Sequence, residues 1–362
     1  MTAAIARRSL LGAALALTAC KGRAQAPPSV GRGSPPPLRS LARFPIGCSV
    51  MTGELADPAF AALLVRQVSQ LTPEWEMKME YILKDDGGFR FDAPDAIAAF
   101  ARQHGMQLFG HNLVWYAQSP IAFERIDGSG KAFADAYRNY ILAVAGRYRG
   151  QARGWDVVNE PVTEAGELRD CLWRRNLGAD YIRLAFEHAA EADPGAALLL
   201  NDYNLESRPQ KRAGFLRVAE GLLKAGAPLK GLGTQSHLSA NLPAGQFAAA
   251  LRDLAGLGLP IHVSELDVSL NRAGGLFASR SDLEAAQARL YAEAAEAFMA
   301  LPEHQRFGFT LWGLRDRDSW LRSDKENPRP PPDAPLLFDD LGQAKPAFWA
   351  VADALGRSRA PV

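Results

Sequence analysis

The chain has 362 residues, a net charge of +1 at pH 7, 48% hydrophobic residues and three cysteines. Both charge signs are dispersed along the sequence, which excludes the basic footprint of a nucleic-acid-binding protein and the cationic surface that attracts anionic membranes. The length fits a single large domain as well as two smaller ones, and we expect a globular protein that acts on a neutral partner.

The amino terminus, residues 1–26, has the layout of an export signal peptide. Arg7 and Arg8 precede an apolar stretch that is too short to span a bilayer permanently, and the adjacent arginines favour the twin-arginine route. Two processing sites compete: a Leu-Thr-Ala-Cys box that would leave Cys20 as a lipid anchor, and an Ala-Gln-Ala site at 24–26. We favour plain secretion into the periplasm or the medium, with lipoprotein anchoring as the alternative.

A proline-rich linker, residues 27–37, follows the signal, because proline fixes φ and lacks the amide donor that helices and central strands need. From residue 38 to 362, short apolar runs alternate with longer Ala-, Leu-, Glu- and Arg-rich stretches that have helical periodicity. Eight such runs predict strands at 46–50, 68–72, 107–111, 154–160, 196–202, 231–237, 261–266 and 307–312. Eight strands with intervening helices, including a closing helix near 344–356, predict an α/β protein that is a single (β/α)8 TIM barrel.

Two glutamates, Glu160 and Glu265, stand at the downstream ends of predicted strands four and seven. Acids at the carboxyl ends of parallel strands lie where α/β barrels build active sites. Two carboxyls that face one cleft are the minimum equipment for hydrolysing a glycosidic bond. A lone Asn-Glu-Pro could equally be a strand-terminating turn, but the second acid favours catalysis.

Other polar and aromatic residues also gather at the predicted strand ends. Each has an ordinary structural alternative, such as a hydrogen-bonded core histidine or a solvated lysine. Together they suit a sugar, because indole faces stack on pyranose rings and amides, carboxylates and imidazoles bind hydroxyls. The candidate binding residues are Glu74, Lys78, His111, Trp115, Gln118, Asn159, Tyr203, Asn204, Gln235, His237, Asp267, Trp312 and Trp320.

The segments Thr-Pro-Glu-Trp-Glu-Met-Lys, Gly-His-Asn-Leu-Val-Trp, Trp-Asp-Val-Val-Asn-Glu-Pro, Asn-Asp-Tyr-Asn, Gly-Thr-Gln-Ser-His-Leu, Ser-Glu-Leu-Asp-Val and Thr-Leu-Trp-Gly resemble, in order and spacing, glycoside hydrolase family 10, the endo-1,4-β-xylanases. The resemblance spans roughly residues 43–355. It implies a retaining enzyme that cleaves internal bonds of xylan and xylo-oligosaccharides by double displacement. The two carboxyls should then lie about 5–5.5 Å apart.

By this resemblance Glu160 is the general acid/base and Glu265 the nucleophile, while Asn159 binds the sugar 2-hydroxyl. His237 contacts Glu265 and is oriented by Asp267, which keeps the nucleophile ionised. The glycone side is lined by Lys78, His111, Glu74, Gln118 and Gln235, the sugar next to the scissile bond is walled by Trp115, Trp312 and Trp320, and the leaving side is faced by Tyr203 and Asn204.

Four positions depart from the family pattern: Trp75 stands where the family commonly has asparagine, Met79 where it has tryptophan, Tyr116 where it often has histidine, and Leu321 where it has arginine. We expect none of them to touch the carboxylates or their immediate partners, so their influence should fall on the outer glycone subsite. Trp75 is either an added stacking platform or a packing residue.

Metal and cofactor sites are not predicted, because the six histidines show no His-x-His or His-Glu-x-x-His spacing. Cys48 and Cys171 should be free, buried thiols on opposite parts of the barrel. We expect a monomer. Two alternatives remain: a related β-1,4-glucanase, and a carbohydrate-binding protein that has lost catalysis, which retention of both glutamates argues against.

Overall fold

The computed structural model describes residues 33–274, 279–328 and 330–357, so the predicted export signal and most of the linker lie outside the described residues. Within these ranges all strands belong to one sheet of order β6-β5-β4-β3-β2-β1-β9-β8-β7, and a further β6–β8 pairing closes it into a barrel. The strands are β1 Ile46–Val50, β2 Gln70–Pro73, β3 Gln107–Trp115, β4 Ala152–Asn159, β5 Ala197–Asp202, β6 Gly231–Thr234, β7 His237–Ser239, β8 Ile261–Ser269 and β9 Arg306–Leu311.

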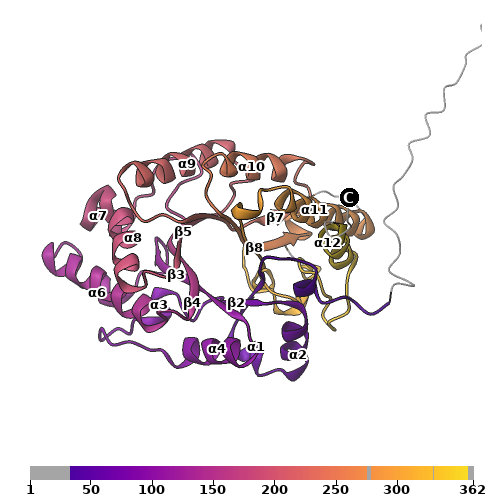
Figure 1. The fold of residues 1–362 in the computed structure, drawn as a ribbon, viewed down its shortest axis with the longest axis horizontal. Helices are drawn as coiled ribbons and strands as arrows, with labels where there is room; N and C mark the ends of the chain where they lie inside the picture. The colour runs from indigo at the N-terminus through magenta and orange to yellow at the C-terminus, as the bar shows by residue number, and fades with distance from the viewer. Residues whose placement is uncertain (1–32, 275–278, 329, 358–362) are drawn as a thin grey trace, which may run out of the picture.

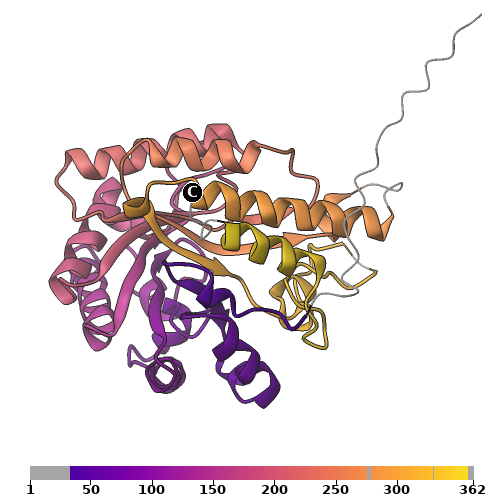
Figure 2. The same ribbon diagram turned by 45° about the vertical axis from the view of Figure 1, so that its right-hand side comes forward.

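Helices surround the strands as an outer ring (Figure 1). The last helix of the described residues lies alongside the helix that precedes it in the chain (Figure 2). The helices are α1 Thr52–Leu55, α2 Pro58–Gln67, α3 Met79–Ile82, α4 Asp92–Gln103, α5 Ile121–Glu124, α6 Lys131–Arg147, α7 Leu172–Leu177, α8 Tyr181–Ala192, α9 Pro209–Lys224, α10 Gln246–Ala255, α11 Arg280–Met299 and α12 Pro346–Arg357. The predicted (β/α)8 barrel is therefore confirmed.

The sixth predicted strand is broken in the structure. We expected one strand over 231–237, but β6 pairs with the first half of β8, and the short β7 pairs with its second half. Between them Ser236 has a positive φ of 64°, which a continuous strand cannot contain. The break turns the backbone so that Gln235 and His237 can both reach the carboxyl-terminal mouth of the barrel.

The interior of the barrel is closed below that mouth by aromatic packing. Phe109 lies two residues before His111 on the same face of β3, and it packs with Leu199 and Phe307. Because this layer fills the barrel axis, the molecule has a floor under its mouth and not a channel.

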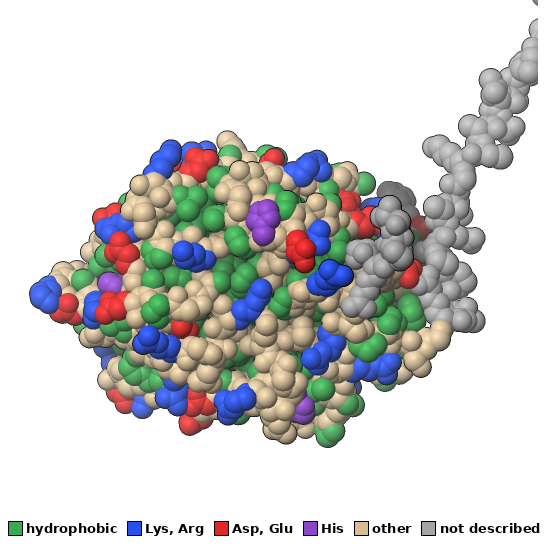
Figure 3. Space-filling model, viewed as in Figure 1, with side chains coloured by type: hydrophobic (Ala, Val, Ile, Leu, Met, Phe, Trp, Pro, Cys, Tyr) green, Lys and Arg blue, Asp and Glu red, His purple; other side chains and the backbone are tan. Residues whose placement is uncertain are grey.

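The described part of the chain contains no helix that is long and apolar enough to cross a membrane. Positive and negative side chains are interspersed over the face shown in Figure 3. Cys48 and Cys171 are both free and buried, as predicted.

Candidate active site

A cleft of about 560 Å³ opens at the carboxyl ends of the strands. Every predicted site residue except Asp267 lines it, and Asp267 lies directly behind His237. The cleft also contains four residues that we did not predict as binding residues: Tyr116, Arg272, Asp324 and Glu326. Residues from the ends of seven of the eight predicted strands are thus brought together in one site.

Glu265 projects from β8 into the cleft with only 3% of its surface exposed. Asn201 Nδ2 donates to its Oε1 at 2.9 Å, and His237 Nε2 lies 3.4 Å from its Oε2. Burial alone would raise the pKa of the Glu265 carboxyl, but attraction to His111 and His237 outweighs burial. The pKa is therefore lowered from its usual 4.5, and the side chain is a carboxylate at neutral pH.

His237 is held by a second acid on the same strand as Glu265. Its Nδ1 lies 3.0 Å from Asp267 Oδ2, and the same oxygen accepts from Trp320 Nε1 at 2.8 Å. Burial lowers the pKa of His237, whereas Asp267 and Glu265 raise it, with a net value of about 10. A protonated imidazole therefore lies between two carboxylates, and Asp267 couples its orientation to the wall residue Trp320.

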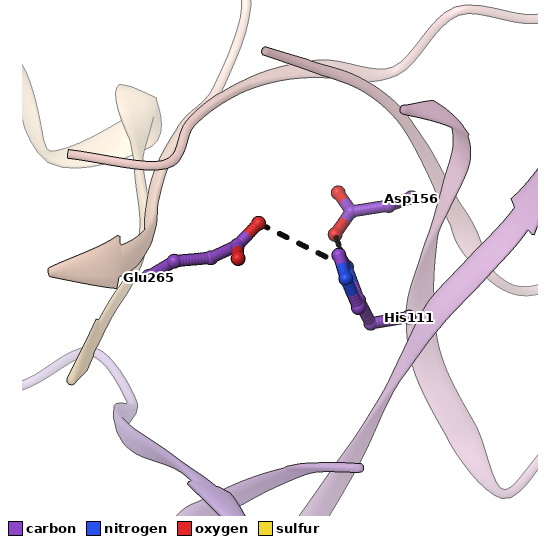
Figure 4. A group of neighbouring side chains, drawn as sticks. All are labelled: His111, Asp156 and Glu265. Atoms are coloured by element: carbon purple, nitrogen blue, oxygen red, sulfur yellow. Dashed lines mark hydrogen bonds and ion pairs between the residues drawn. The ribbon is translucent and has the colours of Figure 1, made fainter. Parts of the chain in front are cut away.

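A second imidazole lies on the other side of Glu265 (Figure 4). His111 Nδ1 is 2.9 Å from Asp156 Oδ2 and 4.0 Å from Glu265 Oε1. Burial raises the pKa of Asp156 to about 6 in spite of this histidine. Asp156 was not among the predicted binding residues, although an acid inside the apolar run of β4 was a signal that could have found it.

These three side chains are also the one cluster among the described residues whose ligand atoms approach closely enough to bind a metal ion. The histidine nitrogen that faces both carboxylates is, however, already at hydrogen-bond distance from Asp156. A shared proton accounts for the geometry without an ion.

Glu160 has a different environment. It follows β4 in a left-handed conformation with φ of 57°, and 8% of its surface is exposed. Gln235 Nε2 donates to its Oε1 at 2.8 Å and Asn159 Nδ2 at 3.2 Å. Its carboxylate forms no ion pair with a described lysine, arginine or histidine, so neutral amides hold it.

A chain of amides connects the two glutamates. Asn159 Oδ1 accepts from Gln235 Nε2 at 3.2 Å and from Asn201 Nδ2 at 2.9 Å, and Asn201 also donates to Glu265. Asn201 fits because Gly233 on the adjacent strand has no side chain: a Cβ there would lie 2.3 Å from its amide oxygen. The network fixes the relative positions of the two carboxyls before any ligand binds.

Glu74, Lys78 and Trp115 form one end of the cleft. Ser49 Oγ donates to Glu74 Oε2 at 3.0 Å, and Lys78 Nζ lies 4.9 Å from the Trp115 ring. Burial raises the pKa of Glu74 to about 7 although Ser49 and Lys78 oppose it. Trp75 does not line the cleft; it is 40% exposed and packs edge-on against Tyr81 at a centroid distance of 4.8 Å.

The opposite end is formed by Tyr203 and Asn204 over a buried ion pair. Lys211 Nζ lies 2.9 Å from Asp202 Oδ1 and 3.1 Å from Glu164 Oε1, and it sits 3.2 Å from the centre of the Tyr203 ring. Asn204 Nδ2 donates to Glu164 at 3.4 Å. Lys211, which lies against the Tyr203 ring, therefore fixes the positions of Tyr203 and Asn204, the two residues that we expected on the leaving side.

Tyr116 is the one substituted position among the four that lines the cleft. The Arg169 guanidinium lies 3.9 Å from its ring centre. Arg169 Nε also donates to the backbone oxygen of Glu160 at 3.1 Å. Tyr116 is thus linked through one arginine to a candidate catalytic residue.

A charged rim runs along the wall formed by Trp320. Arg272 Nη2 lies 2.7 Å from Asp324 Oδ2, and its guanidinium is 5.2 Å from the Trp320 ring centre. Leu321 is fully buried. Arg272 and Asp324 lie in different loops far apart in sequence, so no local spacing could have joined them.

The chain is similar in sequence to known proteins. The sequence model of glycosyl hydrolase family 10 matches residues 39–354. The endo-1,4-beta-xylanase A of Thermoanaerobacterium saccharolyticum is 36% identical over 86% of this chain and 27% of its own length. The exoglucanase XynX of Acetivibrio thermocellus is 35% identical over 86% of this chain and 28% of its own length. The chain thus spans about a quarter of these two relatives.

A solved structure extends the likeness to nearly a whole chain. The intracellular xylanase of Thermoanaerobacterium saccharolyticum, solved as a mutant in complex with xylotetraose, superposes with a TM-score of 0.79 at 36% identity. The match covers 88% of this chain and 99% of that one. Fold and sequence therefore indicate the same family.

Proposed function

Because the chain belongs to glycosyl hydrolase family 10, we propose that it is a retaining endo-1,4-β-xylanase that cleaves internal bonds of xylan by double displacement. The observation that carries the proposal is the pair Glu160 and Glu265, which face one cleft and are joined by a continuous chain of amide hydrogen bonds. A binding protein needs neither the buried pair nor its network.

In the first step Glu265 Oε attacks the anomeric carbon, and the bond to the leaving oxygen breaks. Glu160 gives its proton to that oxygen, so the departing sugar leaves as a neutral alcohol. In the second step Glu160, now a carboxylate, takes a proton from water, whose oxygen displaces Glu265 from the anomeric carbon. Two inversions give net retention.

The surroundings of the two acids support this division of roles. A nucleophile must be ionised, and the imidazoles beside Glu265 lower its pKa. A residue that alternates between acid and base must not be fixed in one charge state, and Glu160 is held by neutral amides. Asn159 donates to Glu160 and lines the cleft, which supports the expectation that it binds the sugar 2-hydroxyl.

A glucan is the second candidate substrate, because one relative is named an exoglucanase. Xylose lacks the hydroxymethyl group of glucose, and Trp312, which is buried in the cleft wall against His111, would crowd that group. One such contact discriminates by about 1–3 kcal/mol, so we expect weak activity on aryl cellobiosides and strong activity on xylan.

The stereochemical course tests the proposal directly. Purified protein is added to xylan, and proton NMR records the anomeric signals of the first products. We expect the β anomer first, with the α anomer appearing later by mutarotation. Initial α product would exclude a retaining mechanism. Absence of any product would show that the protein is not a xylanase.

We also propose that the protein is exported, on the evidence of residues 1–26 alone. Replacing Arg7 and Arg8 with lysines should retain the product inside the cell, as fractionation and immunoblotting would reveal. Metabolic labelling with palmitate distinguishes a lipid anchor at Cys20 from the free form that we favour. Monomeric behaviour in size-exclusion chromatography is expected.

A further inference from the structure

Trp115 and Tyr116 are consecutive residues that serve opposite halves of the cleft. The Trp115 ring lies 4.9 Å from Lys78 Nζ, on the side of Glu74. The Tyr116 ring stands edge-on to the Trp115 ring, at an interplanar angle of 79° and a centroid distance of 6.0 Å, and its face contacts the Arg169 guanidinium. β3 ends at Trp115, so the chain leaves the strand between a residue beside Lys78 and a residue beside Arg169.

Tyr116 belongs to the half that contains Glu160. Burial raises the pKa of the Tyr116 hydroxyl, and the nearby Glu160 carboxylate raises it further. The ring is only partly buried, so one face packs on the Arg169 guanidinium while part of the side chain borders the cleft. The arrangement leaves an aromatic surface beside the proton donor.

Arg169 connects the groups of this half. Its Nη2 donates to the Val162 backbone oxygen at 2.9 Å and lies 3.3 Å from the Tyr203 hydroxyl, while its Nε donates to the Glu160 backbone oxygen. One guanidinium therefore holds two tyrosines and the left-handed backbone of Glu160 in a fixed relation. A planar group with five donors can do this, whereas a lysine cannot.

We propose that Tyr116 is a specificity-determining residue that contacts the leaving xylose, forming with Tyr203 the two walls of that subsite, and that Arg169 is the positioning residue that aligns both with Glu160. The proposal rests on the proposed function, since a general acid must stand on the side of the departing oxygen. A tyrosine offers this sugar a stacking face and a hydroxyl, where the family pattern usually has histidine.

Two substrates with the same glycone separate this role from a purely structural one. Xylotriose, cleaved to xylobiose and xylose, needs both a leaving sugar and a proton. 2,4-Dinitrophenyl β-xylobioside presents the same two glycone sugars but expels a phenolate that needs neither. Wild-type turnover of both substrates tests the proposed function separately.

We expect Tyr116→Ala to lower kcat/KM on xylotriose about ten-fold, the scale of one lost stacking contact, and to change the dinitrophenyl substrate less than about two-fold. Tyr116→His, the residue usual in the family, keeps a ring at this position and guards against misfolding; it should lower the xylotriose value by a smaller factor. Equal losses on both substrates, or none on either, would overturn the proposal.

Trp75→Ala is the matched control, because it removes an exposed aromatic ring that is next to Glu74 in sequence but does not line the cleft. Both substrates fill the same glycone subsites, so the ratio of their kcat/KM values should stay at the wild-type value. A change in ratio as large as that of Tyr116→Ala would show that any aromatic deletion has this effect.

Arg169→Lys tests the positioning role. The positive charge remains but the planar guanidinium with its several donors is lost, so Glu160 should be less well aligned. We expect kcat on xylotriose to fall and the rate on the dinitrophenyl substrate to stay unchanged. The pH profile for xylotriose should change on its basic limb. If only thermal stability falls, with unchanged ratio and pH profile, Arg169 has no positioning role.

Discussion

The two catalytic candidates are the same amino acid in two contrasting environments. Glu265 lies within β8 between two imidazoles, 3% exposed, and attraction to positive charge outweighs the effect of burial on its pKa. Glu160 follows a strand in a left-handed conformation and is held by amides. The fold thus surrounds one carboxyl with cationic groups and the other with neutral amides, a difference that originates in the neighbours and not in the residue.

Removing the nucleophile should have the largest effect. Glu265→Ala leaves no group to form the covalent intermediate, so we expect turnover of every substrate to fall on the order of 10⁵-fold or more. Steady-state assays on xylan and on dinitrophenyl xylobioside measure this loss, with the melting temperature as the control for folding. Substantial activity on either substrate would assign the nucleophile elsewhere.

Removing the acid/base should separate the two steps. Glu160→Ala is expected to lower kcat/KM on xylan by about 10²–10⁴-fold, because general acid–base assistance is lost. The first step on dinitrophenyl xylobioside should be spared, and azide should accelerate the second by replacing the activated water. If azide instead restored Glu265→Ala with retention of configuration, the two roles would be reversed.

His237→Asn should weaken the contrast between the two acids. Without the imidazolium the pKa of Glu265 rises, and since the nucleophile must be ionised, the acid limb of kcat/KM moves to higher pH. We expect a rate loss of about 10²-fold, as for other single electrostatic partners in active sites. An unchanged acid limb would mean that His237 does not keep Glu265 ionised.

The same variant changes the pH dependence of stability. The pKa of His237 is raised by folding from its ordinary 6.5 to about 10, so its stabilising contribution is complete below pH 6.5 and is lost as pH rises through 10. Melting temperatures measured across this window should fall more steeply for the wild type than for His237→Asn.

Trp75→Asn should have the smallest effect. If its exposed ring stacks on the second glycone sugar, kcat/KM should change about two- to ten-fold on xylotriose and aryl xylobioside. The value on aryl xyloside should hardly change, because this substrate does not reach that subsite. A lower melting temperature with unchanged relative rates would identify Trp75 as a packing residue, consistent with its contact with Tyr81.

The sequence predicted the barrel because each strand is a short apolar run between helical stretches, and runs such as Ile261–Ser269 carry their functional residues at the downstream end. Binding residues could be placed near the cleft for the same reason: parallel strands end at one edge. Both predictions rest on local sequence patterns and need no information about contacts between distant segments.

What the sequence could not predict depends on those distant contacts. The break between β6 and β7 appears only when both pair with β8. The role of Arg169 follows from its reach to Tyr116 and to the backbone of Glu160, and nothing in its own neighbourhood marks it. The ion pair of Arg272 with Asp324 likewise joins two loops that only the closed barrel brings together.

The way the barrel closes dictates when the protein can mature during synthesis. β1 pairs with β9, with Ile46 opposite Phe309 and Cys48 opposite Leu311. The strand that is synthesised first therefore cannot complete its pairing until β9 has been synthesised. Until then two apolar sheet edges are unpaired and can associate with other chains. Nascent chains that stop before β9 should therefore aggregate or be degraded, and the complete polypeptide should fold slowly for its size.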